Sequence, residues 1–239
     1  MAITFVQAKS NGTDNTSATT IAVTVSAVGS GNMLAIVATC DNTGTPTCTF
    51  SGGTGTYVTL DTTRDTTNSQ ACFSGYGYNI TTGPTTITAT FSRTASFRGI
   101  SVIEFAGTTT TDPLDGTNHQ SQLQAAPGTG TDGCKSGSGT LTPGADNYVV
   151  WGGSVNTGNS GGGGSEFAAG TSFTEPTNAE FSVAGSISLD SEYWIQTTAT
   201  AANSSFTATV NVAHITFMQV FKVASSAALD QFVVRNPSY

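Results

Sequence analysis

Met33-Leu34-Ala35-Ile36-Val37-Ala38-Thr39-Cys40 is the stretch that decides the fold. It is an apolar run of strand length, followed by the turn-forming Asp41-Asn42-Thr43-Gly44-Thr45-Pro46. Similar runs alternate with clusters of Gly, Asn, Thr and Pro along the chain, and no long stretch keeps the 3.6-residue period of an amphipathic helix. The sequence therefore predicts an all-β protein, an antiparallel β-sandwich.

The composition supports the same fold and excludes several partners. The 239 residues include 44 Thr and 28 Gly, and the abundant β-branched residues suit a half-buried pleated surface. Seven Lys and Arg against fifteen Asp and Glu give a net charge of −8, which does not provide the positive field that nucleic acid requires. No apolar run approaches the ~20 residues of a membrane helix. We therefore expect no nucleic-acid partner and no membrane span.

We expect about twelve strands, each an apolar run bounded by turn residues. Those of the first half are Thr4 to Ala8, Ile21 to Val25, Met33 to Cys40, Tyr57 to Thr62, Ala71 to Ile80, Thr86 to Phe91 and Ile100 to Ala106. Those of the second half are Tyr148 to Ser154, Thr171 to Thr174, Ser186 to Gln196, Phe206 to Val210 and Ile215 to Val223.

The second set of strands is similar to the first at an offset of roughly 115 to 119 residues. Asn32-Met33-Leu34-Ala35-Ile36 corresponds to Asn147-Tyr148-Val149-Val150-Trp151. We interpret this as an internal duplication within a body of residues 1–223, with halves of about 1–107 and 141–223 linked by 108–140. The alternative is that any two Thr-rich β segments look alike.

A duplication permits two arrangements, either two separate small sandwiches or one larger sandwich whose halves interleave their strands. The connection 108–140 is long and polar, but it contains Leu114 and Leu123, which would anchor it against a shared body. We therefore favour the single sandwich.

The segment 224–239 lies outside the repeated pattern and is expected to be a C-terminal tail or arm. Exposing its apolar side chains to water would be unfavourable, so they pack on their own domain or dock on a neighbouring subunit. We favour docking on a neighbouring subunit. These candidate docking residues are Phe232, Val233, Val234 and Tyr239. At the other end, Met1 to Lys9 shows no secretory signal pattern, so we expect either a chain released in the cytoplasm, as a virion component is, or a signal that has been removed.

The four cysteines lack the paired spacing of a zinc site, so we expect no metal and no cofactor. Cys40 and Cys48 flank a turn-rich connection that could bring two strand ends within disulfide distance. They form either a disulfide or two half-buried thiols, and the sequence leaves this open.

The residues for catalysis are sparse, and the protein is not expected to be an enzyme. His119 and His214 are the two histidines, and no Gly-x-Ser-x-Gly motif accompanies them. Glycoside hydrolysis needs two facing carboxylates, and no Glu-x-Asp or Glu-x-Glu pair occurs within an expected strand. Glu104 is the acid inside an apolar strand, and we expect it to face solvent or to pair with Arg98 or Arg93.

Exposed aromatic side chains on a sandwich would favour carbohydrate binding, because the apolar face of a sugar stacks on an aromatic ring. Each of these residues also suits a core position, since adjacent strand residues face opposite ways. The candidates for a glycan platform are Trp151, Trp194, Tyr57, Tyr76 and Tyr78, together with Tyr193.

Four stretches carry a resemblance to a known group of proteins: Ala2 to Gln7, Gly31 to Val37, Thr63 to Asn68, and Ile103 to Gly107 leading to Asp112 to Asp115. Together they resemble a group of poorly described bacterial and phage β-sandwich proteins of jelly-roll, lectin-like (concanavalin A-like) type. The similarity covers most of residues 1–223. It implies a jelly-roll sandwich with a surface or virion role, and it transfers no functional residue.

These observations predict a non-catalytic structural virion protein, such as a capsid decoration or tail-appended subunit, whose partners are other virion subunits or copies of itself. The alternative is a carbohydrate-binding module or adhesin at the cell surface or outside the cell, which would bind surface glycans.

Overall fold

The computed structural model describes residues 2–13, 16–81, 83–125, 130–157, 167–183 and 187–224. These residues form sixteen strands and no helix. The first eight strands are β1 (Thr4–Thr13), β2 (Ala18–Thr24), β3 (Met33–Asp41), β4 (Cys48–Ser51), β5 (Thr56–Asp65), β6 (Gln70–Tyr78), β7 (Thr86–Ala95) and β8 (Arg98–Ala106). The others are β9 (Leu114–Gln124), β10 (Gly130–Lys135), β11 (Tyr148–Asn156), β12 (Phe167–Ala168), β13 (Phe181–Val183), β14 (Ile187–Gln196), β15 (Ser205–Ala208) and β16 (His214–Lys222).

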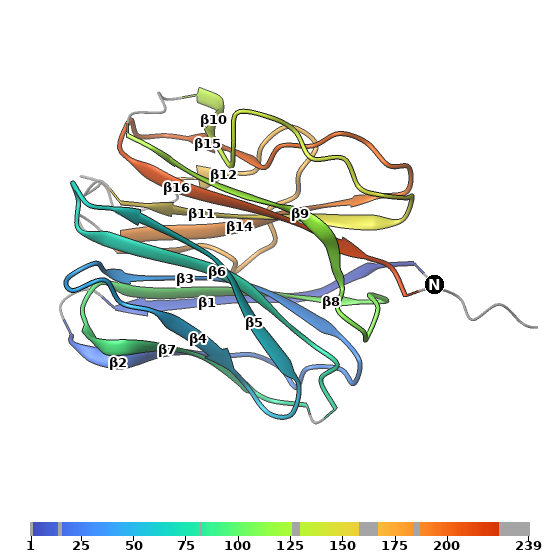
Figure 1. The fold of residues 1–239 in the computed structure, drawn as a ribbon, viewed down its shortest axis with the longest axis horizontal. Helices are drawn as coiled ribbons and strands as arrows, with labels where there is room; N and C mark the ends of the chain where they lie inside the picture. Colours follow the sequence, from blue (N-terminus) through green and yellow to red (C-terminus); the bar gives the residue numbers. More distant parts are fainter. Residues whose placement is uncertain are drawn as a thin grey trace, which may run out of the picture.

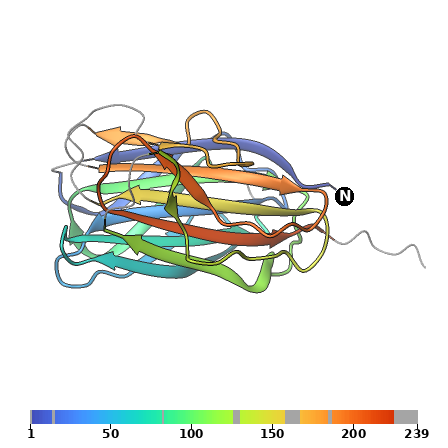
Figure 2. The same cartoon turned by 90° about the horizontal axis from the view of Figure 1, so that it is seen from above.

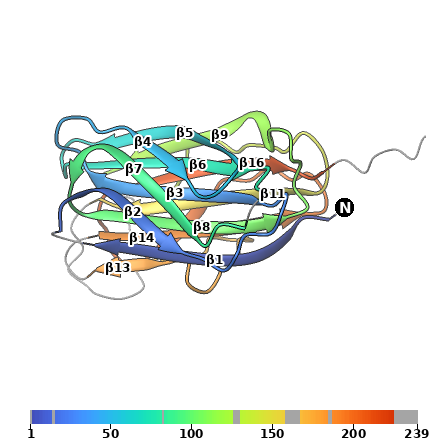
Figure 3. The same cartoon turned by 90° about the horizontal axis from the view of Figure 1, so that it is seen from below.

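The strands form four antiparallel sheets stacked in four layers (Figure 1). The two inner layers are five-stranded, with the orders β1-β8-β3-β6-β5 and β13-β14-β11-β16-β9. The outer layers are three-stranded, β2-β7-β4 against the first inner sheet and β10-β15-β12 against the second. The strands of the stacked sheets run along one long axis (Figures 2 and 3), as in aligned sheet packing. The prediction of an antiparallel β-sandwich is confirmed.

Each half of the chain is a jelly roll. In the first half β1 pairs with β8, β2 with β7 and β3 with β6, and these nested pairs alternate between the two sheets. In the second half β9 pairs with β16, β10 with β15 and β11 with β14. This nesting of first with last strand is the jelly-roll pattern.

The two jelly rolls repeat one strand order. Adding eight to each strand number of the first five-stranded sheet gives β9-β16-β11-β14-β13, which is the second five-stranded sheet read from its other edge. The same operation converts β2-β7-β4 into β10-β15-β12. A repeat is thus present as a repeat of topology. The match of Ile36 with Trp151 is wrong by one residue, because Ile36 faces the first jelly-roll core and Trp151 faces the core between the two inner sheets. Its second copy begins at Leu114, so the segment 108–140 is not a linker, because it supplies β9 and β10.

The halves do not interleave their strands. Among the described strands, every sheet is built from one half only, which differs from the arrangement favoured by the sequence. The halves instead share a core between the two inner sheets, where Val37 and Ile103 of the first half pack with Trp151 and Phe217 of the second.

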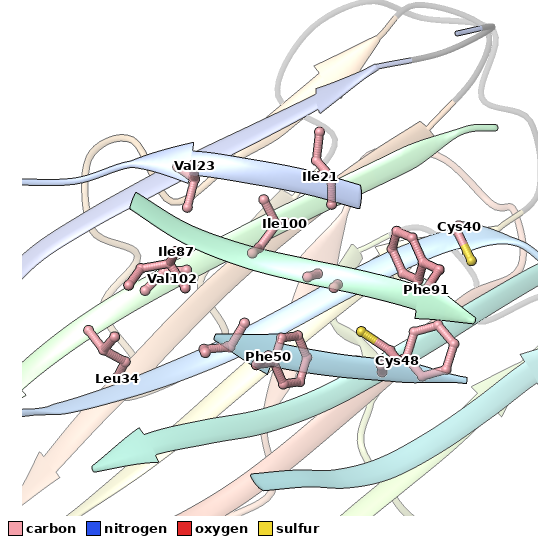
Figure 4. Packing of buried hydrophobic residues seen from close by; sticks show 14 of the residues in the cluster. Ile21, Val23, Leu34, Cys40, Cys48, Phe50, Ile87, Phe91, Ile100 and Val102 are labelled. Carbon is pink, nitrogen blue, oxygen red and sulfur yellow. The ribbon is translucent and has the colours of Figure 1, made fainter. Parts of the chain in front are cut away.

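The inner strands explain the long apolar runs. On β3, Met33, Ala35 and Val37 face the shared core, whereas Leu34 and Ile36 face the core of the first jelly roll. A strand covered on both faces has no solvated face, so its sequence is apolar without alternation. The first jelly-roll core lies between β3, β6, β8 and the outer sheet, with Phe50 and Phe91 at its centre (Figure 4).

Eleven of the twelve expected strands are present, and five further strands were not expected. Thr171 to Thr174 is not a strand, although Thr174 makes an isolated bridge to Tyr193. The additional strands are β4, β9, β10, β12 and β13. They are short or lie at sheet edges, where few apolar side chains are needed.

Candidate functional site

Two of the aromatic candidates lie in the shared core and cannot form a glycan platform. Trp151 is fully buried, and its ring lies beside Gly153 and Val37. Tyr76 is 3% exposed, its ring is 5.5 Å from that of Phe221 in the other jelly roll, and its hydroxyl donates to Asp112 Oδ1 at 2.9 Å. The platform expectation is wrong for these two residues, since burial between two sheets removes both ring faces from solvent.

The other aromatic candidates are half-buried and are divided among three different apolar clusters. Tyr57 packs against the first jelly-roll core and donates its hydroxyl to the Gly52 carbonyl, and burial raises its pKa to about 12. The Tyr78 ring lies 5.9 Å from that of Tyr76 at the shared core. Trp194 belongs to the second jelly roll, and Tyr193 stacks on Phe5 at 5.2 Å across the interface. The structure therefore does not bring these candidates together on one surface.

Cys40 and Cys48 are free thiols rather than a disulfide. Both point into the first jelly-roll core near Phe91 (Figure 4). Burial raises the pKa of Cys40 to about 12 and raises that of Cys48 further. The turn-rich connection does bring these two strand ends into one core, but as apolar packing groups. The proposed docking residues Phe232, Val233, Val234 and Tyr239 lie outside the described residues.

The histidines occupy structural positions. His119 Nδ1 lies 3.0 Å from Asp61 Oδ1, a contact between the two halves, and Ser74 Oγ also approaches Asp61 at 3.4 Å. An activated serine nucleophile contacts the histidine, and the histidine in turn contacts the carboxylate. Here Ser74 contacts the carboxylate of Asp61 and not the imidazole of His119, so this order of contacts is absent. His214 is fully buried on β16, 5.1 Å from the Phe167 ring.

The least expected feature is a polar row inside the second jelly roll. In the first jelly roll, Phe73, Ala38 and Ile100 lie side by side on β6, β3 and β8 and face the outer sheet. The repeat places Asp190, Ser154 and Thr216 in the same row of β14, β11 and β16.

The next row shows a similar replacement. Gly75, Ile36 and Val102 of the first jelly roll are matched by Glu192, Gly152 and Met218 of the second. An apolar core face has thus been exchanged for one that carries two carboxyl groups.

Glu192 is fully buried and holds two segments against β14. Its Oε2 accepts the Gly170 N–H at 2.8 Å, and its Oε1 accepts the Ser204 hydroxyl at 2.8 Å and the Ser205 N–H at 3.1 Å. Burial raises the pKa of Glu192 to about 7, although these three hydrogen bonds oppose the rise. The group therefore changes charge close to neutral pH.

Asp190 is the most strongly perturbed acid of this row. It is fully buried, its Oδ1 accepts the Ser191 N–H at 2.6 Å, and its side chain also forms a hydrogen bond with that of Glu175. Burial raises the pKa of Asp190 well above its ordinary value, and the nearby charge of Glu175 raises it further. Burial and the charge of Glu180 likewise raise the pKa of Glu175.

Asp132 of β10 completes the acidic cluster, which we define as Asp132, Glu175, Glu180, Asp190 and Glu192. Its carboxylate accepts the N–H and the hydroxyl of Thr171, each at 2.8 Å, and the Ser205 hydroxyl at 3.1 Å. Burial acts to raise the pKa of Asp132, but these hydrogen bonds outweigh it and lower the pKa below its ordinary value. In this cluster the pKa of Asp132 is lowered, whereas the pKa values of Glu175, Asp190 and Glu192 are raised.

A sequence signal for this cluster existed and was missed. Asp190-Ser191-Glu192 places two carboxyl groups at alternate positions of one strand, so both point to the same face. The order Asp-x-Glu gives the same common face as Glu-x-Asp and Glu-x-Glu, so the expectation of no facing carboxylates is wrong for this strand.

Glu104 does not face solvent or pair with Arg98 or Arg93. It is 1% exposed and accepts hydrogen bonds from Gln7 Nε2, the Gly29 N–H and Asn32 Nδ2, at 2.5, 2.8 and 2.5 Å. These bonds hold the segment before β3 against the first inner sheet.

Two searches of the described residues found nothing. They contain no group of three or more His, Cys, Asp and Glu side chains placed to hold a metal ion. They also contain no helix of the length and hydropathy needed to span a membrane. No protein-family model, curated protein or solved structure matches the chain.

Proposed function

We propose that this protein is a non-catalytic structural subunit of a virion or surface assembly, in which the tandem jelly roll is the body and the C-terminal arm joins a neighbouring copy. Jelly rolls serve as the building unit of viral capsids and of lectins. The observation that carries the proposal is the face-to-face packing of the two inner sheets. It commits the largest aromatic side chains, Trp151 among them, to holding the body together rather than to a ligand.

The position of the arm supports the role given to it. The described body ends where the Ala224 N–H donates to the Gly107 carbonyl at 2.8 Å, and fifteen residues follow. A chain of that length can extend to about 50 Å, which is enough to reach an adjacent subunit. Burying side chains such as Phe232 and Val233 would contribute about 1.5–3 kcal/mol each.

Deletion of residues 225–239 tests the proposal. The full chain is expected to form oligomers that light scattering and native mass spectrometry detect, and the deleted chain is expected to be a monomer with the same circular dichroism spectrum. The triple variant Phe232→Ser, Val233→Ser, Val234→Ser should match the deletion, whereas Ser238→Ala should match the full chain. The same number of subunits per particle for the full and deleted chains would reject the arm as a connector.

Carbohydrate binding is a second candidate because of one side chain. Trp194 is half-buried on the outer-facing side of β14, two residues from Glu192, and its ring lies 6.1 Å from that of Phe173. A partly exposed aromatic ring suits the apolar face of a sugar. Titration with oligosaccharides should quench tryptophan fluorescence in the native chain but not in Trp194→Ala. An unchanged spectrum at millimolar sugar would remove this candidate.

A further inference from the structure

The second jelly roll adds hydrogen bonds to carboxyl groups to the apolar packing of its outer layer, whereas the first relies on apolar packing. In the first jelly roll, Phe73 packs 5.9 Å from Phe91 of the outer sheet. In the second, Asp190 occupies the position of Phe73, and the outer strand β15 is tied to the inner sheet at Ser205 through Glu192. One fold therefore carries two different kinds of attachment.

The acidic cluster holds two segments of this outer layer. Glu192 accepts hydrogen bonds from Gly170 in the loop and from Ser204 and Ser205 at the start of β15. Asp132 accepts from Thr171 in the same loop and from Ser205 again. The loop and the outer sheet consequently move away from β14 only if these bonds break.

The groups that face Asp190 and Glu192 are mostly acidic. Glu175 and Glu180 come from the loop, Asp132 and the buried thiol of Cys134 come from β10, and His214 lies on the same face of β16. Lys135, an exposed residue of β10, interacts with Asp132. The fully buried Asp190 side chain forms a hydrogen bond with the side chain of Glu175, and two carboxyl groups can do so only while one of them keeps its proton.

We propose that the second jelly roll is a pH-responsive layer. Its outer sheet and the 169–180 loop close on β14 while Asp190 and Glu192 are protonated. The sheet and the loop become looser when these two residues lose their protons. The first jelly roll, with its apolar core, does not respond.

The direction of the response follows from linkage. A group whose pKa is raised in the closed state stabilises that state below its ordinary pKa, and this stabilisation is lost as the pH rises through the raised value. For Glu192 the raised value is about 7 and the ordinary value is 4.5. Between pH 6 and pH 8 this residue alone should raise the opening equilibrium about ten-fold. Asp190 adds to the response in the same direction.

Hydrogen exchange of the full chain at pH 6 and pH 8 tests the proposal, after correction for the intrinsic pH dependence of amide exchange. Peptides that contain β12, the 169–180 loop and β15 should exchange at least about ten-fold faster at pH 8. Peptides that contain β4 and β7 provide the internal control and should not change. Equal ratios in the two jelly rolls would overturn the proposal.

Variants assign the response to its groups. Glu192→Gln and Asp190→Asn keep the shape of each side chain but cannot lose a proton, so each should reduce the ratio, and the double variant should remove most of it and leave only the contribution of Glu175. Glu104→Gln alters a buried carboxyl of the first jelly roll and should leave the ratio unchanged. A ratio as large in the double variant as in the native chain would contradict the proposal.

Two measurements on the native chain do not depend on the variants folding. Infrared difference spectra between pH 6 and pH 8 should show loss of the carbonyl band of protonated carboxyl groups, and absence of this loss would overturn the proposal. Millimolar calcium chloride should leave the exchange ratio unchanged. If calcium suppresses the loosening, the cluster binds a cation and is not a proton switch.

Discussion

Asp65 shows how one residue connects the two jelly rolls. It is 2% exposed and is the last residue of β5, and its Oδ2 accepts the hydroxyl of Thr157 from the second half at 2.6 Å. Its carboxylate also accepts the N–H groups of Thr67 and Asn68 at 2.9 and 3.0 Å. Burial acts to raise the pKa of Asp65, but hydrogen bonds from Thr157, Asn68 and Thr67 outweigh it and lower the pKa. Asp65 therefore stabilises the fold in its charged form, opposite to Glu192.

The substitution Asp65→Asn should reveal this opposite pH dependence. A lowered pKa gives stability that is present above the ordinary value of 3.8 and is lost as the pH falls through the folded value. The variant should lower the free energy of unfolding by about 1–3 kcal/mol at pH 7 and by much less near pH 3. Urea denaturation at the two pH values measures the difference. Thr157→Ser keeps the hydroxyl and should retain most of the stability, and an equal loss for Asp65→Asn at both pH values would contradict the assignment.

At the scale of the element, the strands that were predicted and those that were missed differ in what covers them. β3, β8, β11 and β16 lie inside the inner sheets, so both faces need apolar residues and the sequence shows a continuous run. β9 is an edge strand whose residues after Leu114 are mostly half-exposed, and its sequence Leu114–Gln124 carries no such run. The edge strands β1, β2 and β5 are predictable because each still carries buried or half-buried apolar side chains, whereas β9 depends on its distant partner β16.

The same reasoning explains why the acidic cluster could not be derived in full. Asp190 and Glu192 share a strand, so their common face follows from spacing. Asp132 and Glu175 reach them from β10 and from a loop, and only the pairing of β10 with β15 brings Asp132 close. The sequence pattern contains no signal for that long-range pairing.

A close approach between elements in the second jelly roll provides another prediction. Gly152 of β11 lies where an added methyl group would contact Ser204 Oγ and the Glu192 side chain. Gly152→Ala should therefore displace Ser204 and cost about 1–3 kcal/mol of unfolding free energy. Gly139→Ala is the matched control, because a methyl group there meets no atom within 4 Å. Urea denaturation compares the two, and equal stability would show that Ser204 does not depend on this space.

At the scale of the whole molecule, the two jelly rolls are joined by apolar and polar contacts between their inner sheets. Ser191 Oγ donates to Ser101 Oγ at 3.1 Å, and Gln219 Nε2 donates to Ser74 Oγ at 2.9 Å. All four residues are fully buried, so these bonds fix the relative position of the sheets within an otherwise apolar contact. Neither jelly roll could expose its inner sheet to water without exposing side chains such as Phe217.

The substitution Phe217→Ala tests whether the halves are one cooperative unit. The side chain is fully buried in the shared core, so its loss should cost about 3–5 kcal/mol. Because that core contains residues of both inner sheets, hydrogen exchange should accelerate in β3 as well as in β11. Phe91→Ala removes a ring of equal size from the first jelly-roll core and should accelerate exchange mainly in the first half. If Phe217→Ala affected β11 and left β3 unchanged, the jelly rolls would be energetically independent and the shared core would be a contact between two separate domains.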